Sequence, residues 1–164
     1  MPDQPTPDQP TPDQPTPAQP TPDQPTPPNL LVRPGTVEPF DRGNGVVTIP
    51  YVGRWNCDTN RVTTGQTQFA PGTGLPLHSH NVEESVLVLE GEAVAELGTE
   101  RFDLVAGDAT WVPAGVPHRF LNRGTGLMRI YWVYGGRDVT RTITATGETF
   151  EHLSDADRGG LSAR

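Results

Sequence analysis

Two histidines and a glutamate stand close together in the middle of the chain, between Gly72 and Gly91. His78 and His80 are separated by one residue, so in an extended strand both side chains point to the same side. Glu84 follows after an even step, which can return its carboxylate to that side on the next stretch of strand. Two imidazoles and a carboxylate that converge from one face form the beginning of a transition-metal site.

A third histidine, His118, completes this set from a second segment, residues 107–122. Three neutral imidazoles and a carboxylate offer mixed nitrogen and oxygen donors. Such a set suits Fe(II), Mn(II), Ni(II), Cu(II) or Zn(II) better than Ca²⁺ or Mg²⁺, which prefer oxygen ligands alone. An octahedral metal with these protein ligands keeps positions open for water, dioxygen or a chelating substrate. We therefore predict one divalent transition metal, with Fe(II) favoured, held by His78, His80, Glu84 and His118.

The spacing within these two segments resembles the two signature motifs of the cupin superfamily. The first segment fits G-x5-H-x-H-x3-E-x6-G and the second fits G-x5-P-x-G-x2-H-x3-N, in both cases at every position. The resemblance covers about residues 60–135 and implies a double-stranded β-helix that carries the metal. The superfamily includes dioxygenases, decarboxylases, isomerases, cyclases and proteins that only bind small molecules, so the resemblance does not select a reaction.

The elements that must position these residues are short strands. Frequent glycine and proline, and the absence of a 3.6-residue period, indicate an all-β sandwich or barrel, in agreement with the cupin or jelly-roll barrel that the resemblance implies. We expect Gly91, Gly107 and Gly115 to lie in turns that need a positive φ or a close approach of strands. The expected strands are residues 29–34, 46–52, 61–69, 84–89, 93–97, 101–105, 110–112, 127–134 and 139–146.

The last segment of the chain, from His152 onward, is polar and rich in Asp and Gly. We expect it to be frayed, with about one helical turn, because it offers little to bury. His152 is accordingly expected to be exposed. Cys57 has no metal-ligand spacing and is expected to be a small residue in a loop.

Candidates for the wall of the pocket come from two of the predicted strands. Phe120 shares the inward face with His118. In the strand at 127–134, either the even-numbered or the odd-numbered side chains face the barrel. The odd-numbered set would bring Arg129 and Tyr131 near the metal, where they could orient an acidic substrate. A buried Arg requires an anionic partner, so we expect Arg129 on the outer surface instead, and Glu83 outside as well.

The N-terminal residues 1–28 repeat the unit Asp-Gln-Pro-Thr-Pro. With almost no apolar side chain to bury, this segment is predicted to be a disordered tail with polyproline II character, followed by a single cupin domain at residues 29–164. The tail is either a solvated spacer without a specific task or a ligand for a proline-recognising partner.

Charge and composition limit the possible partners. The four aspartates of the repeat carry half of the net charge of −8, and no basic patch is present to neutralise phosphates, so nucleic acid is not an expected partner. No segment resembles a signal peptide or a membrane span. The single cysteine cannot form an intramolecular disulfide, and we expect a cytoplasmic protein.

Three functions are compatible with such a site. The favoured one is a metal-dependent oxidoreductase, a dioxygenase that acts on a small organic substrate. The second is a non-redox cyclase, isomerase or decarboxylase that uses Zn or Mn as a Lewis acid. The third is a cupin that binds a small molecule without converting it. We also expect a homodimer, because a strand apolar on both faces, Val86–Leu89, needs cover on its outer side.

Overall fold

The fold is built from short antiparallel strands. The computed structural model describes residues 31–57, 60–159 and 161–162, so the repeat at residues 1–28 lies outside the described part. The described elements are η1 (Pro34–Thr36), β1 (Phe40–Gly43), β2 (Val46–Val52), β3 (Thr63–Phe69), β4 (Thr73–Gly74), β5 (His78–His80), β6 (Glu84–Glu90), β7 (Glu92–Leu97), β8 (Glu100–Val105), β9 (Ala109–Val112), β10 (His118–Asn122), β11 (Met128–Tyr134), β12 (Thr140–Ile143), β13 (Thr149–Glu151), η2 (Asp155–Asp157) and β14 (Leu161–Ser162). The all-β prediction is confirmed.

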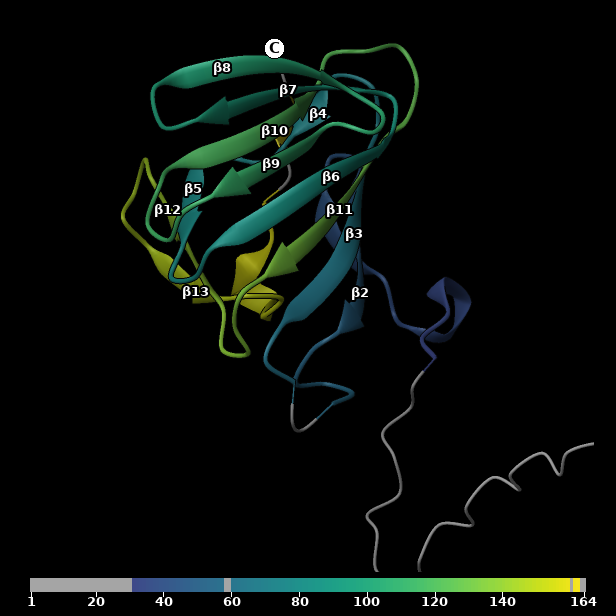
Figure 1. Ribbon diagram of the computed structural model, residues 1–164, viewed down its shortest axis with the longest axis vertical. Coiled ribbons are helices and arrows are strands. Elements are labelled where there is room, and N and C mark those ends of the chain that lie inside the picture. Colours follow the sequence, from purple (N-terminus) through teal and green to yellow (C-terminus); the bar gives the residue numbers. More distant parts are fainter. Residues whose placement is uncertain (1–30, 58–59, 160, 163–164) are drawn as a thin grey trace, which may run out of the picture.

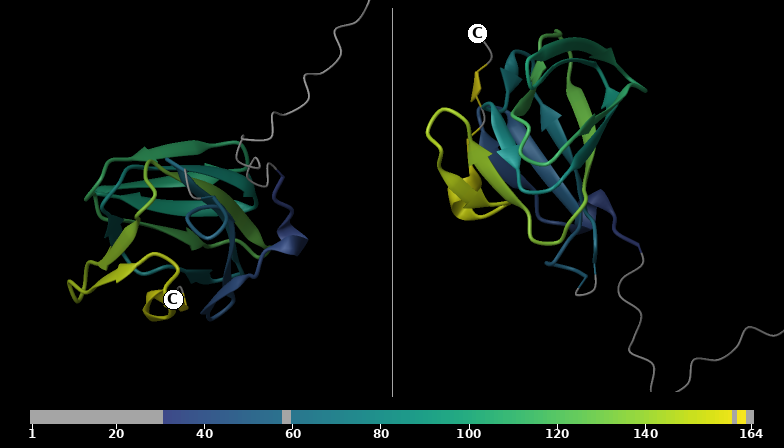
Figure 2. Two further views of the ribbon diagram at one scale, coloured as in Figure 1. Left: turned by 90° about the horizontal axis from the view of Figure 1, so that it is seen from below. Right: turned by 60° about the vertical axis from the view of Figure 1, so that its left-hand side comes forward.

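Two sheets face each other and enclose the core (Figures 1 and 2). One sheet has the strand order β1-β2-β3-β11-β6-β9, and the other has the order β13-β12-β5-β10-β4-β14, with β7 paired to β10 and β8 paired to β7. Strands that are neighbours in space but distant in sequence, such as β3 and β11, give the jelly-roll topology.

Side-chain alternation fixes which face of each central strand lines the barrel. In β6, Glu84, Val86 and Val88 are buried, whereas Leu87 and Leu89 are exposed on the outer face. In β11, the even-numbered side chains from Met128 to Tyr134 are buried and the odd-numbered ones are half-buried. A slip of one residue would exchange these faces, so the buried hydrophobic set determines the register.

Glycines in the two motif segments occupy the backbone conformations that their positions demand. Gly91, Gly107 and Gly115 have φ of 80°, 99° and 78°, as predicted. At Gly91 a Cβ atom would also stand 2.6 Å from the carbonyl oxygen of Leu127, so another residue would strain the backbone and clash with it. This turn lets β7 follow β6 directly.

The two ends of the described chain differ from the prediction. Residues 31–33 form no strand, and the first strand is instead β1, after a short 3-10 helix at Pro34–Thr36. The C-terminal segment does contain one helical turn, η2, but it is not frayed, because β13 pairs with β12 and Asp157 of η2 is fully buried. Among the described residues there is no helix long and apolar enough to cross a membrane.

Candidate metal centre

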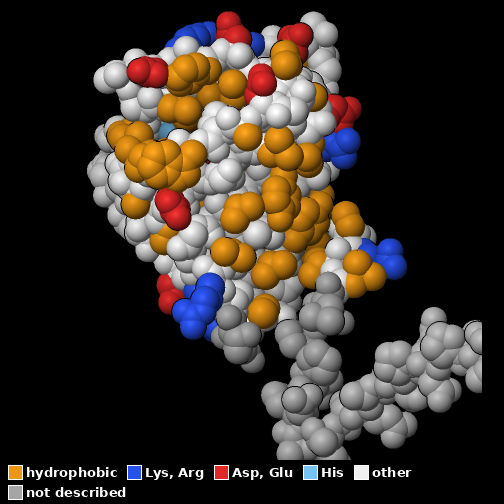
Figure 3. Space-filling model, viewed as in Figure 1, with side chains coloured by type: hydrophobic (Ala, Val, Ile, Leu, Met, Phe, Trp, Pro, Cys, Tyr) orange, Lys and Arg blue, Asp and Glu red, His pale blue; other side chains and the backbone are white. Residues whose placement is uncertain are grey.

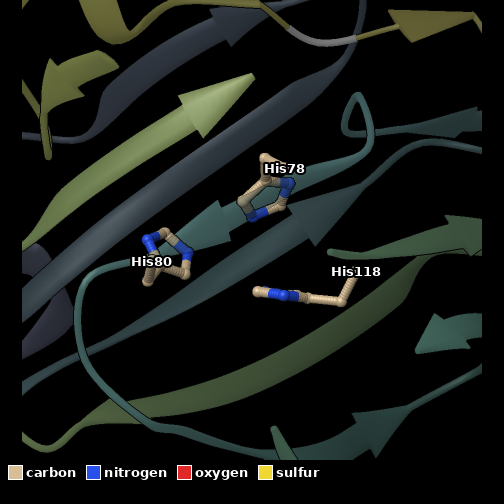
Figure 4. Close-up of side chains that lie close together, drawn as sticks. All are labelled: His78, His80 and His118. Atoms are coloured by element: carbon tan, nitrogen blue, oxygen red, sulfur yellow. The ribbon is translucent and has the colours of Figure 1, made fainter. Parts of the chain in front are cut away.

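Three histidines meet inside the barrel because of the pairing between β5, β10 and β12. His78 and His80 are the first and last residues of β5 and face inward. On one side His118 of β10 lies opposite His78 in the antiparallel register, and on the other side Arg141 of β12 lies opposite His80. Figure 4 shows the three imidazoles turned toward one another. Residues forty apart in sequence are thereby brought to one face of the sheet.

The three imidazoles are close enough to share one ion. Their ligand nitrogens all lie within 4.8 Å of one another, and each residue is buried, with at most 3% of its surface exposed. The ring centroids are 4.6 Å apart for His78 and His118, 4.9 Å for His78 and His80, and 5.3 Å for His80 and His118. Nitrogens in this arrangement can coordinate a common metal, since metal–nitrogen bonds are about 2.0–2.1 Å long.

Hydrogen bonds to the backbone decide which ring nitrogen faces the centre. The Nδ1–H groups of His78, His80 and His118 donate to the carbonyl oxygens of Pro76 (2.7 Å), Thr140 (2.8 Å) and Val116 (2.8 Å). A carbonyl can only accept, so Nδ1 carries the proton and Nε2 presents its lone pair inward. Metal-ligating histidines are held in this way in proteins.

Two of these inward nitrogens have little or nothing to bond to within the described part of the chain. Nε2 of His80 is buried and makes no hydrogen bond there, and the buried Nε2 of His118 has the carboxylate of Glu84 beside it. Leaving buried polar atoms unpaired costs free energy, so the protein must gain something from them. A metal ion would satisfy both nitrogens at once, which is the specific respect in which these residues fit a metal.

Glu84 lies beside the histidines, at the start of β6. Its Oε2 atom is 2.7 Å from Nε2 of His118. Burial acts to raise the pKa of Glu84, but the contacts with His118, the charge of His80 and a hydrogen bond from Tyr134 outweigh it and hold that pKa below its usual value. The same pairing raises the pKa of His118, against the effect of its burial. In the metal-free protein, Glu84 and His118 therefore form an ion pair.

The other histidines of the barrel are held neutral. Burial lowers the pKa of His80 to about 4, and the nearby charge of His118 adds to this effect. Burial also lowers the pKa of His78 well below its ordinary value, with further contributions from His80 and His118. A neutral imidazole is the form that binds a metal, so the centre is prepared for coordination at neutral pH.

A small cavity adjoins the centre. It has a volume of about 20 Å³ and is lined by side chains of both sheets, among them His78, Glu84 and Arg141. This is roughly the space that one water molecule needs. Phe120 lies in its wall, with its ring centroid 6.5 Å from that of His118, where the sequence predicted it.

Arg129 and Tyr131, the other pocket candidates, do not line this cavity. Both belong to the outward-facing set of β11, so the alternative in which they approach the histidines is wrong. The Nε atom of Arg129 lies 2.5 Å from a carboxylate oxygen of Glu90, on the outer surface, and the ring of Tyr131 stacks on Tyr51 with centroids 6.2 Å apart. The even-numbered residues of β11 are apolar enough to fill the core, and they therefore face inward.

The sequence also gave a wrong prediction for His152. This side chain is only 6% exposed, and its ring lies 5.2 Å from Trp132, 5.0 Å from Tyr134 and 6.0 Å from His80, measured between centroids. Burial lowers its pKa well below the ordinary value. His152 closes the cavity from the C-terminal side.

Three further residues near the centre escaped prediction: Arg42, Arg141 and Asp157. All three are buried, and both arginines form ion pairs with Asp157. The alternation of Val139, Arg141 and Ile143 in the predicted strand 139–146 was a usable signal for Arg141, since it places the guanidinium on the same face as buried apolar residues. Arg42 and Asp157 carry no comparable local signal.

Comparison with known proteins agrees with this geometry. Residues 65–134 match the family model described as a cupin domain. Quercetin 2,3-dioxygenase of Bacillus subtilis is 28% identical over 123 residues, which make up 74% of this chain and 36% of the dioxygenase. The transcriptional regulator PuuR of Escherichia coli, of the HTH type, is 41% identical over 51 residues, or 31% of this chain and 28% of the regulator. The chain thus spans about a third of the length of these relatives.

Solved structures show the same fold. Oxalate decarboxylase of Bacillus subtilis superposes with a TM-score of 0.69 at 18% identity, covering 77% of this chain and 35% of the decarboxylase. An RmlC-like cupin from Shewanella frigidimarina superposes with a TM-score of 0.53 at 23% identity, covering 63% of this chain and 87% of that protein. Residues 65–134 thus match a cupin domain, and the chain has the fold of the cupins.

Proposed function

We propose that the chain binds one divalent transition metal through His78, His80, His118 and Glu84. The observation that carries the proposal is the convergence of three buried imidazoles, whose ligand nitrogens lie within 4.8 Å of one another and whose Nδ1 atoms are each tied to a backbone carbonyl. Fe(II) is the favoured metal, and Mn, Ni, Cu or Zn are compatible with the same donors. Glu84 supplies the negative charge that partly offsets the charge of the ion.

The bound metal would serve a reaction on a small organic substrate. We propose an oxidoreductase of the dioxygenase type, and the similarity to a dioxygenase over 74% of this chain supports this choice. When bound, an Fe(II) ion supplies redox chemistry and polarises oxygen ligands. The protein's own contribution is to fix the three imidazoles through their Nδ1–H groups, to orient Glu84 through Tyr134, and to exclude bulk water from the buried cavity.

A second candidate is a cupin that binds a small molecule without converting it. The likeness of 51 residues to a transcriptional regulator favours this alternative. A non-redox reaction at the same metal is the third possibility. Activity of the Zn-loaded protein would reveal it, because Zn has no redox chemistry.

The test combines metal analysis with a matched pair of variants. Elemental analysis of freshly purified protein should find about one transition metal ion per chain, as expected for a single site. Glu84→Gln and His80→Ala should lower that content strongly, whereas Glu83→Gln should not, since Glu83 is exposed and accepts a hydrogen bond from Trp111 instead. Equal metal content in Glu84→Gln and Glu83→Gln would refute the role of Glu84.

Oxygen uptake then separates the functions. Fe(II)-loaded protein should consume oxygen when a panel of chelating organic compounds is added, and Zn-loaded protein should not. Activity that persists without oxygen would indicate a non-redox enzyme. Ligands that bind to the metal-loaded protein and are recovered unchanged would indicate a binding protein.

We also propose that the protein is a homodimer. Leu87 and Leu89 of β6 and Trp111 of β9 are 37%, 42% and 65% exposed on the outer face of the first sheet. Figure 3 shows hydrophobic side chains gathered across this face. A sheet face of this kind is a common site for pairing with a second copy. The cytoplasmic location and a proline-recognising partner for residues 1–28 stay predictions from the sequence.

A further inference from the structure

A buried group of charged side chains borders the proposed metal centre. Arg42 and Arg141 are 4% and 1% exposed, and both contact Asp157, which is fully buried. Nη1 of Arg42 donates to the backbone oxygen of Asp157 (2.7 Å) and to Oδ2 of its carboxylate (3.2 Å). Nε of Arg141 lies 2.5 Å from Oδ1, and Nη2 donates to the backbone oxygen (2.9 Å). Two guanidinium groups thus converge on one carboxylate.

Arg141 keeps one nitrogen free of partners in the described part of the chain. Its Nη1 atom is buried and has no hydrogen-bond partner there. Arg141 lines the same small cavity as His78 and Glu84, and its position on β12 is directly opposite His80. A buried guanidinium N–H group without an acceptor is costly, and because its residue lines the cavity, Arg141 is a ready donor to a ligand that enters there.

Once a metal is bound, the charges around the cavity also favour an anionic ligand. In the metal-free protein, Arg42, Arg141 and the protonated His118 face the carboxylates of Asp157 and Glu84. Binding of a metal displaces the proton of His118. A divalent metal on three neutral imidazoles and Glu84 would then leave an excess of two positive charges in a buried compartment. Buried charge without compensation is strongly unfavourable, so an anionic ligand would be favoured over a neutral one of the same shape.

We propose that the ligand of this centre is a small organic acid, and that Arg141 recognises its carboxylate through Nη1. This inference rests on the proposed metal site and names the class of ligand that the site takes. Arg is suited to this role because its planar fork matches the geometry of a carboxylate. The acid has to be small, with few carbon atoms, because the cavity is narrow. Entry requires the lining to move, and one lining residue, His152, directly follows β13, an edge strand that pairs only with β12.

The experiment measures how much Arg141 contributes to the affinity for the carboxylate group of the ligand. Zn-loaded protein, which cannot turn over by a redox route, is titrated calorimetrically with glycolate and with its uncharged analogue glycolamide. The ratio of the two affinities is compared between the wild type and Arg141→Gln. Because any open metal position prefers an anion, only the change in this ratio reports on Arg141. The proposal predicts a fall in the ratio of at least about tenfold, the usual effect of losing a charged hydrogen bond.

Two further variants keep the test decisive. Arg129→Gln removes a guanidinium of the outer surface, and its ratio should equal that of the wild type. Arg141→Lys retains the positive charge but loses the planar guanidinium, so this variant should fold even if Arg141→Gln does not. Its ratio of glycolate affinity to glycolamide affinity should be lowered by a few-fold. An unchanged ratio in the Arg141 variants, or weaker binding of glycolate than of glycolamide to the wild type, would overturn the proposal.

The metal content of each sample separates this inference from the proposed function. Protein that holds no metal refutes the proposed site itself. Protein that holds about one ion per chain, as expected for a single site, but gives the same ratio with and without the Arg141 guanidinium refutes only the carboxylate-binding role.

Discussion

Acidification should unfold the metal-free protein steeply, because three buried histidines are held neutral in the folded state. Burial lowers the pKa of His80 to about 4, and it lowers those of His78 and His152 well below the ordinary value. In the unfolded chain these imidazoles titrate near pH 6.5. Between the two pKa values the unfolded state binds more protons than the folded state, so stability falls as the pH is lowered through this range.

The size of the effect follows from the number of protons. Each histidine that is charged only after unfolding contributes about 1.4 kcal/mol per pH unit. Three such residues give a slope of roughly 4 kcal/mol per pH unit between pH 5 and 6, a large fraction of the 5–15 kcal/mol that is typical of a domain. His118 does not add to this slope, since its raised pKa leaves it protonated in both states there. Its contribution appears above pH 6.5, where stability falls as the pH rises through the folded pKa.

Urea unfolding of chelator-treated protein, followed by tryptophan fluorescence at a series of pH values, measures this slope directly. The free energy of unfolding should peak near neutral pH and decline on the acid side with an uptake of about three protons. His152→Phe should reduce the uptake by one proton, because it removes one of the three neutral imidazoles. An uptake of one proton or less in the wild type would refute the burial of these side chains, and an unchanged slope in the variant would refute that of His152.

Three other perturbations test separate parts of the molecule. Asp157→Asn should lower the free energy of unfolding by about 3–5 kcal/mol, because it leaves two buried guanidinium groups without a carboxylate, while Asp155→Asn, at an exposed position of η2, should have little effect in the same urea assay. Leu87→Lys should shift the mass measured by light scattering toward that of a monomer, whereas Val105→Lys, at an exposed position of the other sheet, should not. Deletion of residues 1–28 should leave the urea midpoint unchanged, since this segment has almost no apolar side chain to bury.

The sequence predicted the cluster of three histidines because its geometry is locally encoded. The alternation of β5 places His78 and His80 on one face, and the motif spacing places Glu84 and His118 on strands that return to them. The strand predictions between residues 61 and 134 agree with the observed strands to within two residues, apart from β4, which was expected to be a turn. Period-two patterns and glycine turns are properties of neighbouring residues, and a single sequence displays them directly.

The residues that close the cavity could not be predicted in this way. Arg42 and Asp157 are 115 positions apart in the chain, and each is buried only because the other is there. Taken alone, a charged side chain in a polar segment indicates exposure. His152 was placed in solvent for the same reason: the segment that follows it looks polar, but Asp157 within it is anchored by two guanidinium groups.

The motif residues follow from local patterns, whereas several residues around the cavity depend on contacts between distant parts of the chain. Function can therefore be inferred from the motifs only in part. In the proposed function the motif residues hold the metal, and parts of this chain are similar to proteins that differ in activity, a dioxygenase and a transcriptional regulator. We propose that the choice of ligand depends instead on side chains that reach the cavity from β1, β12 and the C-terminal segment, outside the residues that match the cupin model. Arg141, His152 and Asp157 all lie beyond residue 134. In this proposal the charges of Arg141 and Asp157 favour an anionic ligand, so substitutions at these two positions should change which molecules bind while the metal content stays the same.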